Sequence, residues 1–446
     1  MREMKNKVSG FVILIKFMKR KFIQRILKSL SQTILKKYQP LVIAVIGSTG
    51  KTSTKEAIYC VLKDNFQVGK NELNLNTEIG APLTLILGKN AKRNIFLWLY
   101  NFLKAFFLII FPYKKYPKIW ILEMSEDRPG ILTYLFNLTQ PKIVVLSWIG
   151  EIPVHIANYS SLNAYKKEII SCCQKLKADD VLVLNTDSFL FEEIKEKSSA
   201  KIITYGISKK ADFSVTNYKL ILNEEGEIEM HFRLETQDNF LPVKIKNIFS
   251  QVYLYPLLSA IVIGDYFNLN LLTITNALEN YKVPKGRPHL IEGKNGSLIF
   301  NDSYNANPDS TLAALNSFQE VFEVLKEKKN LKRKILVLGD MLELGEYSSI
   351  AHQKIGEETA KIGDYFFSVG KEMKLAGEIF SQQKGEDKVF FFEDSSSCAK
   401  AIETFIQAGD FVLVKGSRGM HLEIVTQKIM AHPEQAKELL TFDITS

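Results

Sequence analysis

Short runs of aliphatic residues alternate with segments of helical periodicity along most of the chain, starting at Leu41. Each run is nearly continuous in apolar character, which is typical of parallel strands buried on both faces by helices. We therefore predict an α/β fold with mostly parallel sheets. The clearest strands of the first series are predicted at residues 41–47, 118–124, 142–148, 180–185 and 201–206.

After this series the pattern changes twice. Residues 213–245 alternate apolar and polar positions more regularly, which indicates an antiparallel edge or a hairpin that turns near Gly226. Segment 283–288 contains two prolines and a glycine and is a predicted linker. A second α/β series follows, so we predict one domain over residues 41–285 and a Rossmann-like domain over residues 286–446. The strands of the second domain are predicted at residues 297–302, 334–340, 365–370, 388–394 and 410–417.

The excess positive charge of the chain is confined to its first forty residues. This tail holds eleven Lys or Arg and one acidic residue, whereas the other residues hold 47 basic and 48 acidic ones. We therefore predict no nucleic-acid partner for the folded domains. Apolar residues three and four apart, with cations between them, predict an amphipathic helix in residues 1–40 that suits an anionic membrane surface. The alternative is a helix that packs on its own domain and leaves its basic face in water.

The other apolar and cysteine patterns bear on where the protein resides. The apolar stretch 95–111 is slightly short for a membrane span and is interrupted by Asn101 and Lys104. We predict an interfacial or core helix there, with the core favoured, and no transmembrane helix. The four cysteines have neither metal-ligand spacing nor the pattern of a disulfide framework, which favours a reducing cytoplasm.

Residues 42–58 combine a buried strand, a glycine turn and the start of a helix. In such a turn the backbone N–H groups and the helix N-terminus point at one anion, so the turn can bind phosphate. Val45 stands where the usual phosphate loop has its first glycine, so this loop is a shortened one. Lys51 can reach the outer phosphates and Thr52 can place its hydroxyl on Mg²⁺, although an ordinary strand-to-helix turn is the alternative. The predicted nucleotide-binding residues are Gly47, Ser48, Thr49, Gly50, Lys51, Thr52 and Ser53.

A carboxylate at the end of a predicted strand can complete this site, because phosphoryl transfer needs a group that holds the metal. Glu123 ends the apolar run 119–122. It would stand at the carboxyl edge of a strand beside the loop, where open α/β sheets bind their ligands. A glutamate at a strand end is by itself usually a solvated residue, but beside the loop Glu123 is a predicted metal ligand.

Five further motifs follow the loop in a fixed order. They are NLNTEIGAPLTLIL (74–87), LEMSEDRPG (122–130), NDSYNANPDS (301–310), VLGDMLELG (337–345) and LVKGSRG (413–419). Together with IGSTGKTS they resemble the Mur ligases, and among these the members that add D-alanyl-D-alanine to UDP-N-acetylmuramoyl-tripeptide. The resemblance covers the chain from about Leu41 to the C-terminal region, and DSYNAN, GDMLELG and KGSR are its specific part.

The resemblance implies an ATP-dependent carboxylate–amine ligase of peptidoglycan precursor synthesis, with a P-loop-type ATPase domain and a C-terminal domain. In this family ATP phosphorylates a substrate carboxylate, and an amine then attacks the acyl phosphate. The cofactors would be ATP and Mg²⁺, and the substrates a UDP-sugar peptide and D-alanyl-D-alanine. We further expect a cytoplasmic monomer, with peripheral contact to the inner face of the membrane through residues 1–40.

The resemblance also implies roles for single residues. Lys51 and Glu123 would be catalytic, and Thr52 with Glu123 would hold the Mg²⁺ that bridges the terminal phosphates. His155 falls where the family has a catalytic histidine on a second metal. Lys166 matches a lysine that is commonly carbamylated in the family, which would make it an anionic metal ligand. The adjacent Lys167 leaves two registers open for this match.

In the second domain the resemblance implies the contacts that close over ATP. Asn305 and Asn307 would face adenine, because an amide both donates and accepts toward a purine edge. Asp340 would contact the ribose, and Arg287 would reach the phosphates or the interdomain linker. The substrate-binding residues would be Asn74, Asn76, Lys415, Ser417 and Arg418, the last three around the carboxylate of the incoming dipeptide.

Three features depart from the family pattern. Thr77 stands where a second asparagine is common, and SEDRPG replaces an Asn-His pair after the glutamate. About forty residues precede the first strand, where the family carries a domain that grips the UDP-sugar. This third departure bears on how a nucleotide-sugar substrate would be bound. The alternatives are a Mur-like ligase with another acceptor, either folylpolyglutamate-type or lipid-linked, and a membrane-associated nucleotide-binding protein without ligase activity.

Overall fold

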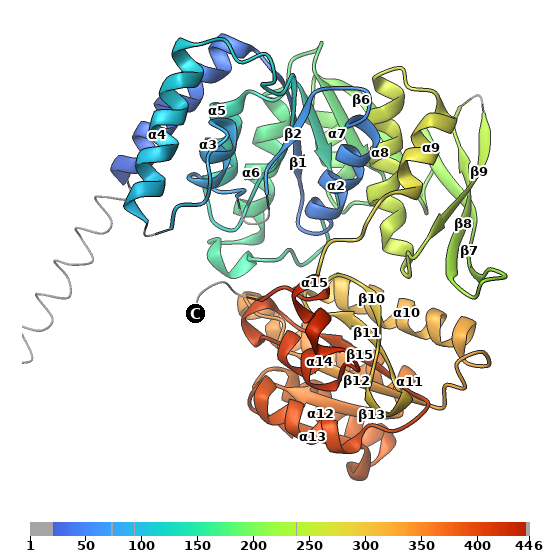
Figure 1. Cartoon of the computed structure of the whole chain (residues 1–446). Coiled ribbons are helices and arrows are strands. Elements are labelled where there is room, and N and C mark those ends of the chain that lie inside the picture. Colours follow the sequence, from blue (N-terminus) through green and yellow to red (C-terminus); the bar gives the residue numbers. More distant parts are fainter. Residues whose placement is uncertain (1–20, 73–74, 93, 238, 443–446) are drawn as a thin grey trace, which may run out of the picture.

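The computed structural model describes residues 21–72, 75–92, 94–237 and 239–442. They form an N-terminal lobe built on one sheet and a C-terminal lobe built on another (Figure 1). A single chain segment between residues 279 and 289 joins the last helix of the first lobe to the first strand of the second. The part of the predicted tail at residues 1–20 and the predicted substrate residue Asn74 lie outside the described residues.

The N-terminal lobe contains a nine-stranded sheet in the order β2-β3-β1-β4-β5-β6-β7-β8-β9. Neighbouring strands from β2 to β7 run parallel, whereas β8 pairs antiparallel with both β7 and β9. The predicted antiparallel edge is therefore confirmed. The strands are β1 (Leu41–Ile46), β2 (Val68–Lys70), β3 (Ile119–Glu123), β4 (Ile143–Leu146), β5 (Val181–Asn185), β6 (Lys201–Gly206), β7 (Phe213–Leu222), β8 (Ile228–Glu235) and β9 (Phe240–Lys246).

Helices cover both faces of this sheet, which explains why its central strands are apolar throughout. In β1, Ile43 and Val45 face one core and Ala44 and Ile46 face the other, and all four are fully buried. The first core includes α2 and α8, and the second includes α5 and α6. The helices are α2 (Lys51–Leu62), α3 (Gly80–Leu85), α4 (Ile95–Ile110), α5 (Ile131–Thr139), α6 (Leu162–Gln174), α7 (Phe191–Lys197), α8 (Leu254–Tyr266) and α9 (Leu271–Glu279).

The C-terminal lobe contains a six-stranded sheet in the order β10-β11-β15-β12-β13-β14, parallel except for β10. Phe318 and Phe411 stack in its core with ring centroids 4.4 Å apart. The predicted α/β class is confirmed in both lobes. The elements are β10 (His289–Glu292), β11 (Leu298–Asp302), α10 (Pro308–Leu325), β12 (Arg333–Gly339), α11 (Ser348–Ile362), β13 (Tyr365–Val369), α12 (Met373–Lys384), β14 (Val389–Phe392), α13 (Ser395–Phe405), β15 (Asp410–Lys415), α14 (Glu423–Ile429) and α15 (Ala436–Leu439).

Residues 21–38 are helical and pack on the N-terminal lobe. Leu27 and Ile34 are fully buried there, in the same core as α5 and α6. The Lys37 ammonium donates hydrogen bonds to the carbonyls of Leu108 and Phe111, at the C-terminal end of α4, at 2.9 and 2.8 Å. A cation at this end of a helix compensates both the unpaired carbonyls and the helix dipole. The described part of the basic helix is thus anchored to its own lobe and to α4.

The apolar stretch 95–111 forms α4, and most of it lies outside the core. Only Asn101, Ala105 and Leu108 of this helix are buried. Asn101 interrupts the apolar run for a structural reason, because its amide donates to the Lys89 carbonyl and accepts from the Lys89 N–H. The prediction that favoured a core helix was therefore wrong for the outer face of α4. Among the described residues, no helix has both the length and the apolar character needed to cross a bilayer.

A buried histidine joins α11 to the loop after β12. His352 Nε2 accepts from the Met341 N–H at 3.0 Å, and its Nδ1–H donates to the Ser348 carbonyl at 2.8 Å. These two bonds together need the neutral ring. Burial lowers the pKa of His352 from its ordinary value of 6.5, and it outweighs Asp340 and Glu372, which act in the opposite direction.

We expect this histidine to make the protein less stable in acid. Because its pKa is lower in the folded state, the unfolded chain binds the proton first as the pH falls. The contribution of His352 is complete above about pH 6.5 and is lost toward its folded pKa, with a slope of at most about 1.4 kcal/mol per pH unit. Thermal unfolding of the parent and of His352→Gln, followed between about pH 5 and 7, should give a shallower pH dependence for the variant. Equal slopes would contradict this assignment.

Candidate active site

The glycine turn between β1 and α2 is held open toward the C-terminal lobe. Gly47 and Gly50 both adopt positive φ, 131° and 84°, and a Cβ on Gly47 would collide with the Ser147 side chain. The N–H groups of Ser48 and Thr49 donate to the Trp148 carbonyl at 2.9 and 3.1 Å, which fixes the turn against the end of β4. No side chain caps α2, so the N–H groups of its first turn are available to an anion.

Glu123 lies next to the start of α2, as the strand-end argument predicts. The Thr52 hydroxyl donates to one Glu123 carboxylate oxygen at 2.9 Å, and the Asn76 amide donates to the other at 3.1 Å. The Asn71 side chain forms two hydrogen bonds with the backbone of Glu123. Its oxygen accepts from the Glu123 N–H, and its amide group donates to the Glu123 carbonyl. Sequence reasoning missed Asn71, because an asparagine after a short edge strand gives no signal of its own.

The Lys51 ammonium is held between the turn and a second carboxylate. It donates to the Gly47 carbonyl at 2.5 Å and to Glu126 at 2.6 Å. Glu126 is buried, and desolvation raises its pKa, with Lys51 acting in the opposite direction. Glu126 belongs to the SEDRPG segment that departs from the family pattern. The departure was visible in the sequence, but the ion pair with Lys51 was not.

His155 and Lys166 have different surroundings. His155 has a left-handed backbone conformation, with φ of 66°, and lines the same cavity as Thr52 and Glu123. Its Nδ1 contacts the carboxylate of Glu343 from the C-terminal lobe. Lys166 lies on α6 with its ammonium 4.3 Å from the ring centre of Phe189, and it lines neither of the two cavities that the loop borders.

The C-terminal lobe meets the loop through the N-terminus of α10. The Asn307 amide donates to the Thr49 hydroxyl at 2.8 Å, and Asn307 also caps α10 in a capping box with Ser310. The Asn305 side-chain oxygen accepts from the Ala306 N–H at 2.9 Å. The Arg287 guanidinium lies 4.5 Å from the ring centre of Tyr304. Capping explains why an asparagine precedes Pro308, independently of any ligand.

Four predicted residues of the C-terminal lobe are engaged with neighbouring protein groups. The Asp340 carboxylate accepts from the N–H groups of Lys371 and Met373, at 3.1 and 2.7 Å, and does not line the cavities at the loop. The Ser417 hydroxyl donates to the Ala306 carbonyl at 3.2 Å, and Arg418 donates to the Thr441 carbonyl at 2.5 Å. Lys415 is fully buried and donates to Asp302 at 2.6 Å. Burial lowers the pKa of Lys415, and Asp302 opposes this.

Two adjoining cavities lie between the lobes. The smaller, of about 130 Å³, is bordered by the loop, Glu123, His155, Asn305 and Asn307. The larger, of about 390 Å³, extends from Thr49 past Trp148 toward α10. Thr49, Gly50, Arg287 and Ser310 line both.

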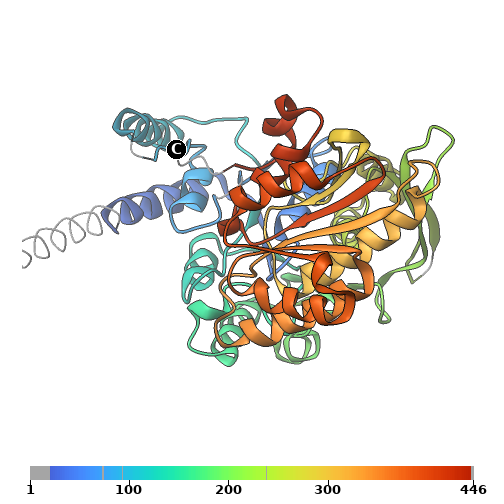
Figure 2. The ribbon, with the colours of Figure 1, turned by 90° about the horizontal axis from the view of Figure 1, so that it is seen from below.

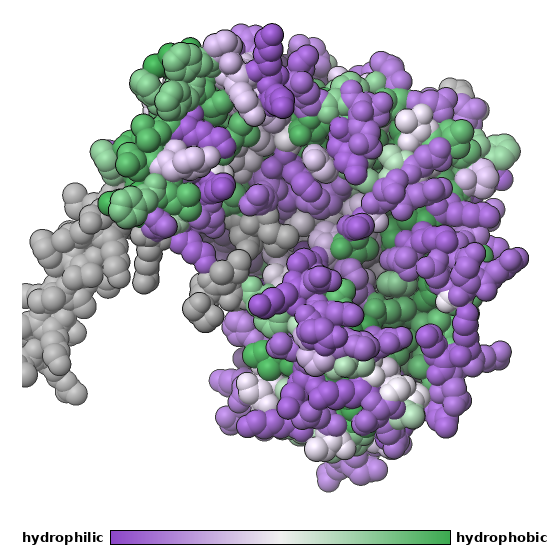
Figure 3. Space-filling model, viewed as in Figure 1, coloured by the Kyte–Doolittle hydropathy of each residue, from purple (hydrophilic) through white to green (hydrophobic). Residues whose placement is uncertain are grey.

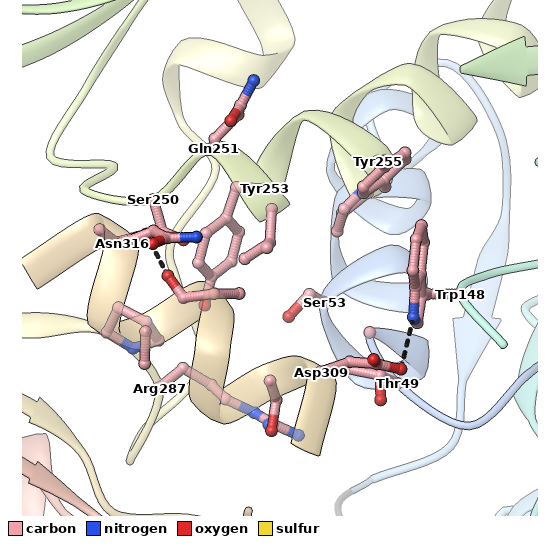
Figure 4. Close-up of a pocket in the computed structure, with 18 of the residues that line it drawn as sticks. Thr49, Ser53, Trp148, Ser250, Gln251, Tyr253, Tyr255, Arg287, Asp309 and Asn316 are labelled. Carbon is pink, nitrogen blue, oxygen red and sulfur yellow. Dashed lines mark hydrogen bonds between the residues drawn. The ribbon is translucent and has the colours of Figure 1, made fainter. Parts of the chain in front are cut away.

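In Figure 4 the side chains of both lobes face the larger cavity. Thr49, Ser53 and Trp148 come from the N-terminal lobe, and Arg287 and Asp309 come from the linker side and from α10. The Trp148 indole N–H donates to Asp309 at 3.1 Å. Burial raises the pKa of Asp309, and this hydrogen bond opposes the shift. Sequence reasoning also missed Trp148 and Asp309, whose proximity depends on how the lobes meet.

Comparisons with known proteins find relatives that span both lobes. The Mur ligase middle domain matches residues 105–261, and the Mur ligase glutamate ligase domain matches residues 286–418. The UDP-N-acetylmuramoyl-tripeptide–D-alanyl-D-alanine ligase of Bacillus subtilis is 29% identical over 413 residues, which are 91% of this chain and 79% of that protein. The enzyme of the same name from Haemophilus influenzae is 26% identical over 414 residues, 90% of this chain and 79% of that protein.

Solved structures share the fold. MurF from Acinetobacter baumannii superposes with a TM-score of 0.72 at 22% identity, over 90% of this chain and 79% of that one. MurF from Thermotoga maritima in complex with ADP gives a TM-score of 0.69 at 23% identity, over 93% of this chain and 84% of that one. The two domain matches, the relatives that span both lobes and the common fold lead to one conclusion. The chain belongs to the Mur ligase family.

Proposed function

We propose that the protein is an ATP-dependent ligase that joins D-alanyl-D-alanine to a UDP-N-acetylmuramoyl-tripeptide. The relatives that align over both lobes carry this activity in their names. The observation that carries the proposal is the cleft itself. Lys51, the Thr52–Glu123 pair and Asn307 border one cavity, although they come from different lobes.

The chemistry explains why such a cleft is needed. A carboxylate is a poor electrophile until one of its oxygens carries a good leaving group. Transfer of the terminal phosphoryl group of ATP to that oxygen releases ADP and makes an acyl phosphate. The amine of the dipeptide then attacks the carbonyl carbon, inorganic phosphate leaves with the C–O bonding electrons, and the nitrogen gives up a proton. The site must therefore hold several anions together and compensate their repulsion.

Lys51 supplies the fixed positive charge for this task. Its ammonium lies at the mouth of the turn, where it would meet the outer phosphates of ATP. Its present acceptors are the Gly47 carbonyl and Glu126, so a phosphate oxygen would add to or replace these contacts. The open N–H groups of α2 and the N-terminal end of the helix dipole act on the same anion.

The pair Thr52 and Glu123 fits a magnesium ion. Both present oxygen atoms, the ligands that Mg²⁺ prefers, and Mg²⁺ usually takes one or two protein carboxylates together with substrate phosphates. The described residues contain no cluster of three or more His, Cys, Asp and Glu side chains that could hold a metal without a substrate. When bound, the ion would reduce the negative charge of the phosphates. His155 and a carbamylated Lys166 remain our proposal for a second metal.

We assign the binding of ATP, the dipeptide and the peptide acceptor to residues of both lobes. We propose that the adenine lies where the two cavities adjoin, near Asn305 and Asn307, which line the smaller one, and that Arg287, which lines both, reaches the phosphates. The proposed ribose contact of Asp340 requires a movement of the C-terminal lobe, because Asp340 does not line either cavity at the loop. Its carboxylate would then accept from the ribose in addition to, or in place of, the N–H groups of Lys371 and Met373. The proposed dipeptide residues are Lys415, Ser417 and Arg418, and Asn76 faces the peptide acceptor.

We further propose a cytoplasmic protein that works as a monomer. One observation supports the cytoplasmic location: all four cysteines are free and buried, as is usual in a reducing compartment.

The decisive experiment is a phosphate-release assay with the purified full chain, ATP and Mg²⁺. We expect release only when the UDP-muramoyl tripeptide and D-alanyl-D-alanine are both present. Mass spectrometry should find the pentapeptide product in amounts equal to the phosphate. Release without the dipeptide would contradict the ligase reaction. Phosphate release with glutamate and a folate-type or lipid-linked acceptor in place of these substrates would support the ligase reaction but contradict the proposed substrates.

A further inference from the structure

The outer face of α4 is unusually apolar for a surface helix. Phe96 and Ile95 are 80% and 74% exposed, and no charged residue interrupts this face between them and Ile110. Figure 3 shows hydrophobic residues gathered over α4 at the upper left of the molecule. Both ribbon views place α4 at the margin of the N-terminal lobe rather than between the lobes (Figures 1 and 2). The outer face consists of Ile95, Phe96, Leu99, Tyr100, Leu103, Phe106, Phe107 and Ile110.

Large apolar patches on soluble proteins usually mark contact surfaces, so the outer face needs an occupant. The composition of the outer face indicates which kind of partner covers it. Seven of the eight side chains of the outer face are aliphatic or phenylalanine, and five of these recur three and four positions apart from Phe96 to Ile110. Tyr100 and the neighbouring Tyr113 add exposed phenols. Aromatic residues with one polar atom concentrate where hydrocarbon meets water at a membrane surface.

The charge around the outer face has one sign. Residues 21–38 contain five Lys or Arg, and residues 89–118 contain seven. Neither segment contains an Asp or a Glu. By contrast, residues 119–446 contain 36 basic and 44 acidic residues, so the positive charge is local to this part of the chain. Such a surface is complementary to anionic headgroups, and the remainder of the protein is repelled by them.

Some of these cations lie directly beside the apolar stripe. The ammonium groups of Lys89 and Lys104 lie 6.0 and 5.8 Å from the ring centre of Tyr100. Lys114 and Lys115 are exposed just beyond the end of the helix. Lysine side chains in this position can extend their charge to the headgroups while their methylene stems remain on the apolar surface.

We propose that α4, together with the helix at residues 21–38, docks the protein on the surface of an anionic phospholipid bilayer. The axis of α4 would lie in the plane of the membrane, with its outer face at the boundary between headgroups and acyl chains. This geometry agrees with the finding that no described helix is long and apolar enough to span a bilayer. Lys37, which joins the two helices through the carbonyls of α4, keeps them together as one surface.

The test uses the full chain and vesicles in a flotation assay. Vesicles of phosphatidylcholine alone are compared with vesicles that also contain phosphatidylglycerol. We expect the parent protein to float with the anionic vesicles, and to be released by added salt because charge attraction is screened. The double variant Leu103→Glu/Phe107→Glu should partition at least about tenfold less, because it places two carboxylates on the inserted face.

A matched control separates this effect from general loss of surface hydrophobicity. Leu272 and Ile350 are 59% and 64% exposed on α9 and α11, similar to Leu103 and Phe107, but lie outside the patch. Leu272→Glu/Ile350→Glu should float like the parent.

Three outcomes would overturn the proposal. The first is a parent protein that stays with the soluble fraction. The second is a Leu103→Glu/Phe107→Glu variant that floats as well as the parent while its thermal unfolding is unchanged, since the basic residues alone would then account for binding. The third is a protein that dimerises through α4 in solution and does not bind vesicles. Soluble-substrate turnover should be the same in all these variants, so failure of this proposal leaves the ligase proposal intact.

Discussion

Replacing Lys51 with alanine should reduce the rate of ATP-dependent phosphate release by about two hundredfold or more, which corresponds to about 3 kcal/mol of activation free energy. The lysine is the one side-chain ammonium at the mouth of the glycine turn among the residues that line the smaller cavity. Charge that develops on the transferring phosphoryl group would lose its nearest fixed cation. Initial rates at saturating ATP and both substrates measure the effect.

The ion pair with Glu126 complicates this experiment and also supplies its control. Without Lys51 the buried Glu126 loses the cation that opposes the rise of its pKa, so the carboxyl should become neutral and the fold less stable. The double variant Lys51→Ala/Glu126→Gln should regain thermal stability but not activity. Lys70→Ala, which removes a lysine paired with Glu56 outside both cavities, should leave the rate nearly unchanged. Near-parental activity in Lys51→Ala would contradict every enzymatic interpretation of this cleft.

Replacing Glu123 with glutamine should lower the rate by about a hundredfold and weaken the response to Mg²⁺. The substitution keeps the size of the side chain and its ability to accept from Thr52, but removes the negative charge that would attract the metal. Rates measured against Mg²⁺ concentration should therefore show a higher half-saturating concentration as well as a lower plateau. A lower plateau with unchanged half-saturation would assign Glu123 a positioning role instead.

A second glutamate provides the matched control for this substitution. Glu78 forms an ion pair with Arg128 at 2.7 Å, and it does not line the cavities at the loop. Glu78→Gln should change neither the rate nor the Mg²⁺ dependence appreciably, since an ion pair with an exposed arginine contributes little. Thermal unfolding of both variants should establish that the fold is intact before the rates are compared.

Much of the architecture is predictable from the sequence because its determinants are local. The strand at residues 41–46 is apolar at every position since both of its faces are covered, and the turn after it needs glycines at positive φ. The position of Glu123 beside Thr52 was also predictable, because neighbouring parallel strands end at the same edge of a sheet. The strands β1 and β3 are neighbours, and Val45 lies opposite Glu123.

What the sequence does not predict depends on contacts between distant segments. The pairing of Lys51 with Glu126, of His155 with Glu343 and of Trp148 with Asp309 each joins parts of the chain that no spacing rule relates. The outer face of α4 is a different case. Apolar periodicity shows that a helix has an apolar side, but does not show whether protein covers it. The interruption at Asn101 is structural, and the exposed side had to be observed.

The hydrogen bond between Thr49 and Asn307 spans 258 residues and crosses from one lobe to the other. Both lobes therefore supply walls of the two cavities at the loop, and neither lobe encloses them alone. A rotation that separates the lobes at this point lengthens the bond. The distance between Thr49 and Asn307 therefore measures how far the cleft is closed. Two spectroscopic labels, one beside Thr49 and one beside Asn307, would therefore measure in single molecules the distance between the lobes and show when the cleft is closed.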